Sequence, residues 1–366
     1  MEDMEMRDKS FWANRKVFVT GHTGFKGTWL SVWLLELGAK VTGYSLDVPT
    51  NPSLFEEVGI KSFICDMRGD ICNLSALKNA IKVASPEIVI HLAAQPIVKE
   101  SYLNPIGTLV TNAIGTANVL EAVRESEAVK AVLIITTDKV YENKEWLWGY
   151  RENEPLGGYD PYSASKACAE IITSSYRRSF FDRTNLGYRA VGIATARAGN
   201  VIGGGDWAKD RIIPDCVRSF NKGEKVKIRN PESIRPWQYV LEPLSGYLQL
   251  CEKLYSGSPE YADSWNFGPK DEDGKTVEWV VKKMNSLWPS APGYIIDETK
   301  HAHEATYLKL DSSKARSIIG WQPKWHVSEA IAKDVDWNLR FNSGIPALSI
   351  CRQQIAEYQI ASTQTD

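Results

Sequence analysis

A glycine-rich turn near the N-terminus constrains the fold of this chain more than any other feature of its sequence. Residues 16–20 (KVFVT) are apolar enough for a buried strand, and residues 21–27 (GHTGFKG) follow directly. A helix is expected over 24–37, ended by Gly38 where a left-handed residue often terminates a helix. Glycines let the backbone approach a ligand closely, and the first helical turn offers N–H groups and a positive dipole end to a phosphate. Glycine also occurs in ordinary turns, but a triplet between a strand and a helix favours a dinucleotide-binding site. The residues expected to bind the cofactor there are Gly21, Thr23, Gly24, Phe25 and Gly27.

The alternation of short apolar runs and longer helical stretches continues over the first 200 residues. Further strands are expected at 40–44, 87–92, 131–136 and 190–197, and longer helices at 106–126 and 163–180. This pattern predicts an α/β fold, a doubly wound parallel sheet with helices on both faces. After Asn200 helices and short strands mix, so we expect a dinucleotide-binding domain at 1–199 and a smaller, mixed α/β substrate lobe at 200–366, with some interchange of segments.

Charge and cysteine usage argue against several classes of protein. The formal net charge is −2 and no basic run occurs, which disfavours nucleic-acid binding. The six cysteines are scattered without a Cys-x-x-Cys pair, as is typical of free thiols in a reducing compartment. The first ten residues are charged, and no run of about 18 apolar residues exists. We therefore expect no secretory signal and no membrane span, but a cytoplasmic protein.

The choice between NAD and NADP depends on the residues after the second expected strand. Asp47 follows the glycine turn by about twenty residues, the spacing at which an acid commonly meets the adenosine ribose. The strand ends near Ser45, however, so Asp47 could equally open a loop beyond that site. No Arg follows the strand directly to receive a 2′-phosphate, which favours NAD. Asp66 and Met67 are candidates for the adenine, although a solvated charge pair with Arg68 fits the spacing equally well.

A Tyr-x-x-x-Lys pair, Tyr162 and Lys166, stands at the start of the helix expected at 163–180. The spacing of four places both side chains on one face. A free Tyr has a pKa near ~10 and is a poor base at neutral pH. A nearby ammonium and a cationic nicotinamide both favour the phenolate and would lower this pKa. Such pairs occur on helices by chance, but downstream of the glycine turn the pair favours a redox site.

Together with further motifs, these residues resemble the extended short-chain dehydrogenase/reductase family and, within it, the sugar-nucleotide 4,6-dehydratases. The resemblance covers about residues 11–325. The motifs that carry it, besides the glycine turn and the Tyr-Lys pair, are HLAAQ at 91–95, TDK at 137–139 and Asn200. The segments that resemble the branch acting on CDP-glucose are DK at 138–139, GYRENE at 149–154, GNVIGGGDW at 199–207 and RPW at 235–237. The resemblance implies a Rossmann-type fold and NAD as cofactor, contacted also by Ala93, Ala94 and Gln95.

The reaction that this resemblance implies takes a hydride from the sugar and returns it. NAD⁺ oxidises the C4 hydroxyl, with Tyr162 accepting its proton, Lys166 holding the cofactor ribose and Thr137 hydrogen-bonding the C4 oxygen. The C4 ketone acidifies the C5 proton, so that water leaves across C5 and C6. The hydride then goes to C6, which gives a 4-keto-6-deoxy sugar without net consumption of cofactor.

The roles of Asp138 and Lys139 are the least settled part of this scheme. Asp138 is the candidate acid for the departing C6 hydroxyl, which requires that burial or a negative neighbour keep it protonated. From the residue alone, a cap or loop role would be preferred. Lys139 departs from the dTDP-glucose branch, in which a Glu follows the Asp. It either removes the C5 proton as a neutral amine, crowded by Lys166 and the nicotinamide, or orients Asp138 or a water.

A nucleotide sugar carries a pyrophosphate that needs fixed donors. Arg235 is the guanidinium favoured for bidentate contact. Further substrate-binding candidates, by resemblance, are Asn200, Arg211, His303 and Glu304. Trp207 and Trp237 either flank the substrate or pack within the lobe. His301 and His303 alternate without a nearby third ligand, so no metal site is expected.

The helices expected at 106–126 and 163–180 carry apolar residues around more than one face. In this family such a pair commonly forms a four-helix interface, which implies a homodimer, although the monomer could also cover both helices. Two other functions stay open. A nucleotide-sugar 4-epimerase would share the glycine turn and the Tyr162–Lys166 pair but would need no acid at Asp138. A non-catalytic NAD-binding scaffold would not need the pair.

Overall fold

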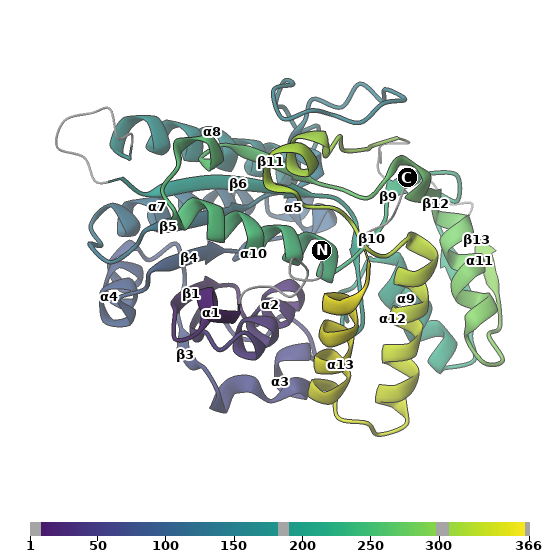
Figure 1. Cartoon of the computed structure of the whole chain (residues 1–366). Coiled ribbons are helices and arrows are strands. Elements are labelled where there is room, and N and C mark those ends of the chain that lie inside the picture. The colour runs from purple at the N-terminus through teal and green to yellow at the C-terminus, as the bar shows by residue number, and fades with distance from the viewer. Residues whose placement is uncertain (1–8, 182–189, 298–306, 363–366) are drawn as a thin grey trace.

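The computed structural model of the chain describes residues 9–181, 190–297 and 307–362. A seven-stranded parallel sheet lies at its centre, in the order β11-β6-β5-β4-β1-β2-β3 (Figure 1). Its strands are β1 (Lys16–Thr20), β2 (Lys40–Ser45), β3 (Cys65–Arg68), β4 (Ile88–His91), β5 (Ala131–Ile135), β6 (Gly192–Ala198) and β11 (Ser264–Phe267). The strand order reverses between β1 and β4, so the expected doubly wound α/β fold of the Rossmann type is confirmed.

Helices cover both faces of the sheet (Figure 1). The helices on one face are α2 (Phe25–Glu36) and α10 (Leu241–Tyr255); those on the other are α4 (Leu74–Ala84), α7 (Gly115–Arg124) and α8 (Pro161–Phe180). Strand side chains alternate between the two layers. In β1, Val17 and Val19 join the core beneath α2, while Phe18 joins the core beneath α4 and α7. All five residues of β5 are buried, because both of its faces are covered.

Two strands of this sheet escaped sequence analysis. β3 reads CDMR and lies at the edge, where partly exposed polar residues give no apolar signal. β11 comes from beyond residue 200 and pairs with β6, and α10 from the same region packs on β5 and β6. The division at 199/200 is therefore not a clean spatial boundary, and segments do interchange. The helix expected at 106–126 runs as α6 (Pro105–Leu109), a π-helical turn η2 (Val110–Ile114) and α7.

The smaller lobe combines helices with two-stranded pairs, as expected. Its helices are α9 (Ile212–Asn221), α11 (Val277–Leu287), α12 (Val327–Asn342) and α13 (Ala347–Ile360), and its strands are β7 (Val201–Ile202), β8 (Val226–Ile228), β9 (Ile234–Pro236), β10 (Gln238–Tyr239), β12 (Gly274–Thr276) and β13 (Tyr294–Ile296). The short helices elsewhere are α1 (Lys9–Trp12), α3 (Leu54–Val58) and α5 (Val98–Leu103), with turns η1 (Ile60–Ser62), η3 (Asp138–Val140), η4 (Pro259–Tyr261), η5 (Asp271–Asp273) and η6 (Ala315–Ile319). Over the described ranges, no helix has the length and apolar character needed to cross a membrane.

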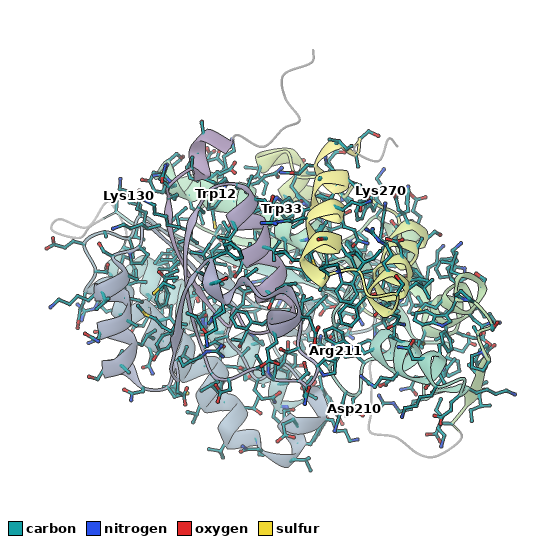
Figure 2. The ribbon with its side chains drawn as sticks, turned by 90° about the horizontal axis from the view of Figure 1, so that it is seen from below. Trp12, Trp33, Lys130, Asp210, Arg211 and Lys270 are labelled. Atoms are coloured by element: carbon teal, nitrogen blue, oxygen red, sulfur yellow. The ribbon has the colours of Figure 1, made fainter. Side chains whose placement is uncertain are left out.

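The lobe and the sheet domain share a core, which fixes the geometry between them. Trp33 of α2 meets Tyr358 of α13 edge to face, with ring centres 5.7 Å apart; Figure 2 labels Trp33 between α2 and the yellow C-terminal helices. At the start of α10 the buried Glu242 accepts hydrogen bonds of 2.7 Å from the Trp325 N–H and from the Tyr358 hydroxyl. Apolar residues of both parts form one continuous cluster.

A buried ion pair ties α8 to the sheet. Arg197 of β6 lies 2.8 Å from Glu170 of α8, and each side chain is only 2% exposed. Glu170 also accepts from the Thr136 and Thr195 hydroxyls. Burial alone would raise the pKa of Glu170, but the Arg197 guanidinium and these hydrogen bonds hold it below its usual value.

Removing the guanidinium would leave that carboxylate buried without its counter-charge. We expect Arg197→Met to lower the free energy of unfolding by about 3–5 kcal/mol, measured by urea denaturation. Arg178→Met is the matched control on the exposed face of α8 and should change stability by less than about 0.5 kcal/mol. Equal unfolding midpoints for the two variants would show that the pair does not hold α8 in place.

Candidate active site

The carboxyl ends of the parallel strands meet at one edge of the sheet, where a cleft of about 1540 Å³ opens against the lobe. Its volume exceeds the roughly 300–1,000 Å³ of usual small-ligand sites, which leaves room for two nucleotides. Loops that follow β1, β2, β4, β5 and β6 all line it. The sequence-predicted residues that line the cleft are Gly21, Thr23, Gly24, Phe25, Gly27, Asp47, Ala93, Ala94, Thr137, Asp138, Lys139, Tyr162, Lys166, Asn200, Arg211 and Arg235.

The glycine turn closes too tightly for any other residue at two positions. Gly21 has a φ of +73°, and a Cβ on it would stand 2.7 Å from the Ala93 nitrogen. A Cβ on Gly27 would stand 2.1 Å from the Gly21 carbonyl oxygen. Gly24 forms the N-cap of α2, and no side chain of a described residue caps it. The turn therefore presents the open start of a helix to the cleft, which fits the pyrophosphate of a dinucleotide.

The end of β2 is more cationic than the sequence suggested. Asp47 lines the cleft with its side chain 98% exposed, 3.9 Å from Arg68. Arg68 comes from β3 and donates a 3.0 Å hydrogen bond to the Leu46 carbonyl oxygen. No Arg follows β2 directly in the sequence, but parallel pairing brings Arg68 of the next strand alongside its end.

Three residues expected to bind the cofactor do not line the cleft. Asp66 is engaged by His22 at 2.8 Å and by Arg68 at 3.0 Å. Met67 packs against the core beneath α4 and α7. The side chain of Gln95 turns back on its own loop, where its oxygen accepts from the Ile97 N–H at 2.5 Å. In each case the side chain is used within the protein, which a motif match does not reveal.

Lys166 is positioned by both its helix and the sheet. Asp160 caps α8 by accepting from the Ser163 N–H at 3.0 Å, and Pro161 occupies the first helical turn. The Lys166 ammonium donates a 3.0 Å hydrogen bond to the Ile135 carbonyl oxygen at the end of β5. Burial lowers the pKa of Lys166 to about 8, against the opposing charge of Glu170.

Tyr162 lies one turn earlier on α8 and is buried. Burial raises its pKa to about 12, while the Thr137 hydroxyl and the Arg211 guanidinium act in the opposite direction. Among the groups of the protein alone, burial outweighs the favourable charges; the lowering expected from the sequence also depends on a cationic nicotinamide. The groups of the protein alone leave Tyr162 a phenol at neutral pH, so its deprotonation requires a further positive charge beside it.

Asp138 is almost completely buried, 1% exposed, in the turn η3 that follows β5. Its Oδ1 accepts a 2.9 Å hydrogen bond from Thr137 and lies 3.9 Å from the Lys139 ammonium. Its Oδ2 is buried without a hydrogen-bond partner in the described part of the chain. Gly199 leaves room beside this oxygen, since a Cβ there would stand 3.0 Å from it. A buried carboxyl oxygen without a hydrogen-bond partner is unusual, and a hydroxyl of a ligand in the cleft could supply that partner.

The lobe supplies further cations to the cleft. Arg211, at the start of α9, lies 2.8 Å from Asp206, and Figure 2 labels it with its neighbour Asp210 beside the teal helix. The negative charge of the Asp206 carboxylate raises the pKa of Arg211, and burial acts in the opposite direction. Arg235 is 8% exposed on β9 and donates a 3.0 Å hydrogen bond to the Ile234 carbonyl oxygen. Cationic residues that line the cleft and that sequence analysis did not assign to it are Lys26, Lys99, Lys144, Lys227 and Arg229.

The remaining residues that the sequence suggested for the substrate site differ in where they lie. Trp207 packs against Trp337 and Phe341 within the lobe, so its role is structural. Trp237 lines the cleft and donates to the Lys275 carbonyl oxygen at 2.8 Å. The candidates His301, His303 and Glu304 lie outside the described residues. Within the described residues, no group of His, Cys, Asp and Glu is arranged to hold a metal ion.

Comparisons with known proteins agree with this geometry. Residues 18–333 match the family described as GDP-mannose 4,6 dehydratase. The chain is 53% identical to a CDP-glucose 4,6-dehydratase of Salmonella typhimurium over 98% of this chain and 100% of that protein. Among solved structures, the UDP-glucose 4-epimerase of Thermotoga maritima with UDP-glucose is 21% identical, with a TM-score of 0.76 over 89% of this chain and 99% of that one. The dTDP-glucose 4,6-dehydratase of Bacillus anthracis in complex with NAD is 22% identical, with a TM-score of 0.73 over 91% and 99%. At these identities the solved structures show the shared fold, and the match over residues 18–333 shows that the chain belongs to the GDP-mannose 4,6 dehydratase family.

Proposed function

We propose that this chain is an NAD-dependent CDP-glucose 4,6-dehydratase, a hydro-lyase that forms CDP-4-keto-6-deoxyglucose. The observation that carries the proposal is a buried Asp138 with an unpartnered Oδ2, in the same cleft as Tyr162 and Lys166. Redox groups alone would fit any enzyme that oxidises a sugar hydroxyl. An acid that can protonate a leaving hydroxyl is needed when water departs. The 53% identity to a CDP-glucose 4,6-dehydratase supports the substrate.

The first step oxidises C4 of the glucose. NAD⁺, when bound, supplies a reversible hydride acceptor with a positive charge on its nicotinamide. That charge offsets the burial that holds the pKa of Tyr162 at about 12, so the phenolate can take the proton of the C4 hydroxyl. Thr137 interacts with the Tyr162 hydroxyl and is therefore placed to hydrogen-bond the C4 oxygen as well. Lys166, held on the Ile135 carbonyl oxygen, is placed to bind the cofactor ribose.

The second step removes water and the third restores the hydride. With C4 a ketone, the C5 proton is acidic; its removal and the departure of the C6 hydroxyl form a C5–C6 double bond. Asp138 donates its proton to that hydroxyl, which leaves as water. Hydride addition at C6 and protonation at C5 complete the product. Lys139, 3.9 Å from Asp138, is placed either to remove and return the C5 proton or to orient Asp138.

The diphosphate of the substrate needs cations on the lobe side of the cleft. Arg211 and Arg235 line it from the start of α9 and from β9, and Asn200 follows β6. We assign these three residues to the substrate. In a cytoplasmic setting, the expected site of action, all six cysteines can remain free thiols.

The rival function, a nucleotide-sugar 4-epimerase, would use Tyr162 and Lys166 without needing an acid. The position of Asp138 favours the dehydratase for this reason. Its carboxyl is desolvated and faces the cleft, whereas an epimerase would gain nothing from the cost of that burial.

Replacing this acid separates the two functions. The unmodified protein should convert CDP-glucose to the 4-keto-6-deoxy product. We expect Asp138→Asn to slow water loss by about 10²–10⁴-fold, the usual contribution of a general acid, while reduced nicotinamide still forms transiently. Product analysis by NMR and nicotinamide absorbance measure the two steps. Asp336→Asn, the same change at an exposed site paired with Arg340, is the control. Full dehydratase activity in Asp138→Asn, or an epimerised hexose as product, would contradict the proposal.

A homodimer through α6 and α8 is the second part of the proposal. These helices pack together with α5 and η2 and leave large apolar side chains in solvent. The exposed fractions are 75% for Leu103, 70% for Ile106, 52% for Ile114 and 59% for Ile171. Isolated exposed apolar residues are ordinary, but several on neighbouring helices form a patch that a second copy would cover.

A charge in the centre of this patch should separate the subunits. We expect the unmodified protein to sediment as a dimer or larger assembly and Ile106→Glu/Ile171→Glu to sediment as a monomer at the same micromolar concentration. Val83→Glu is the control, because Val83 is 66% exposed on α4, outside the patch. A monomeric unmodified protein, or a double variant that stays assembled, would exclude this interface.

A further inference from the structure

Lys26 occupies an unusual position, the second residue of α2 inside the glycine turn. The turn cannot relax around it, because Gly27 lies directly against the Gly21 carbonyl oxygen. The side chain of Lys26 is partly buried and lines the same cleft as Tyr162. The described residues offer its ammonium no hydrogen bond and no ion pair. Its Nζ lies 6.0 Å from the ring centre of Tyr247 on α10.

The charges around Lys26 do not neutralise it. Arg211 and Lys166 act on it as like charges, and Asp138 opposes them only when its carboxyl is ionised. Asp138 is shared with Thr137 and lies 3.9 Å from a second ammonium, that of Lys139. Burial, assisted by Arg211 and Lys166, lowers the pKa of Lys26 to about 7. The hydroxyl of Tyr247 is also buried without a partner among the described residues.

An ammonium held among cations needs an anion that this part of the protein does not provide. The open first turn of α2 carries the same preference, since its backbone N–H groups and dipole favour negative charge. Two sources of a diphosphate reach the cleft in the proposed function, the dinucleotide and the sugar nucleotide. The helix that follows the first strand is the site of the dinucleotide in a doubly wound sheet. The lobe residues Arg211 and Arg235 are assigned above to the other diphosphate, that of the sugar nucleotide.

We propose that Lys26 binds the pyrophosphate of the NAD cofactor through its ammonium, as a cofactor-affinity residue that acts together with the glycine turn. The proposal rests on the proposed function only in taking NAD as the cofactor.

A dependence on pH follows from this assignment. A phosphate beside Lys26 favours the charged ammonium, so binding above pH 7 must take up a proton, whereas below pH 7 the proton is already present. The affinity of the protein for NAD⁺ should therefore fall as the pH rises above 7. Lys166, with a pKa of about 8, also titrates near this range, so its share must be separated from that of Lys26, whereas Tyr162 at about 12 does not titrate there. Comparison with a variant that lacks the Lys26 amine isolates its share.

The test measures NAD⁺ and CDP binding separately by isothermal titration calorimetry, without turnover. We expect Lys26→Met to bind NAD⁺ about ten- to a hundredfold more weakly than the unmodified protein at pH 6.5, the usual effect of losing one charge-assisted hydrogen bond. Its affinity for CDP should be unchanged. At pH 8, titrations in two buffers of different ionisation enthalpy should show less proton uptake for Lys26→Met than for the unmodified protein.

Two further variants guard against a trivial result. Lys26→Arg keeps the charge but does not titrate near pH 7, so it should bind NAD⁺ with a smaller loss than Lys26→Met and with a weaker pH dependence. Lys40→Met removes one charge at the exposed start of β2 and should bind both ligands as the unmodified protein does. Unchanged NAD⁺ binding by Lys26→Met would overturn the inference, and weakened CDP binding alone would assign Lys26 to the substrate instead. Failure of the unmodified protein to bind NAD⁺ would overturn the proposed function itself.

Discussion

The hydrogen bonds and the ion pair that Glu170 of α8 makes with the sheet determine where Tyr162 and Lys166 lie. Its carboxylate accepts from Thr136 at the end of β5, from Thr195 of β6 and from Arg197, so one turn of α8 is tied to two neighbouring strands. Lys166 lies one turn earlier on α8 and reaches the last carbonyl oxygen of β5, and Tyr162 lies a further turn along. A carboxylate satisfied in this way is expensive to displace. The positions of Tyr162 and Lys166, the catalytic residues of the proposed function, therefore depend on the core rather than on the loops around the cleft.

Burial has opposite consequences for the ionisable groups of the cleft. It raises the pKa of Tyr162 and lowers those of Lys26 and Lys166, so each side chain is driven towards its neutral form. In the proposed function, a cationic nicotinamide would reverse the effect on Tyr162, and the diphosphate of the cofactor would reverse the effect on Lys26. In this proposal, the bound cofactor and substrate supply the counter-charges that the buried ionisable groups lack in the protein alone. This makes the site most reactive when cofactor and substrate are bound together, and it protects the phenol of Tyr162 from ionising before then.

Much of the fold and of the site follows from the sequence, for identifiable reasons. β1, β2 and β5 are rich in apolar or β-branched residues, which identifies them as strands. The glycine turn and the Tyr162–Lys166 pair can be recognised from the spacing of their residues in the sequence. β3 was missed because it is a four-residue edge strand with only one large apolar residue, Met67, and β11 because it enters the sheet from beyond residue 200. Contacts between strands cannot be predicted from the order of residues alone. Arg68, for example, reaches the end of β2 only because β2 and β3 pair in parallel. Gln95 belongs to a recognisable motif, yet its side chain serves its own loop.

The central claim is that the hydride removed from the sugar returns to the same sugar molecule at a different carbon. CDP-glucose deuterated at C4 and incubated with a catalytic amount of NAD⁺ tests it, with NMR and mass spectrometry of the product as the readout. The account predicts deuterium at C6 of the 4-keto-6-deoxy sugar, one label per molecule, and no exchange of label with unlabelled substrate in a mixed incubation. Deuterium retained at C4 would instead indicate an epimerase, and deuterium accumulating in the reduced cofactor would indicate a simple dehydrogenase. Either result would contradict the account.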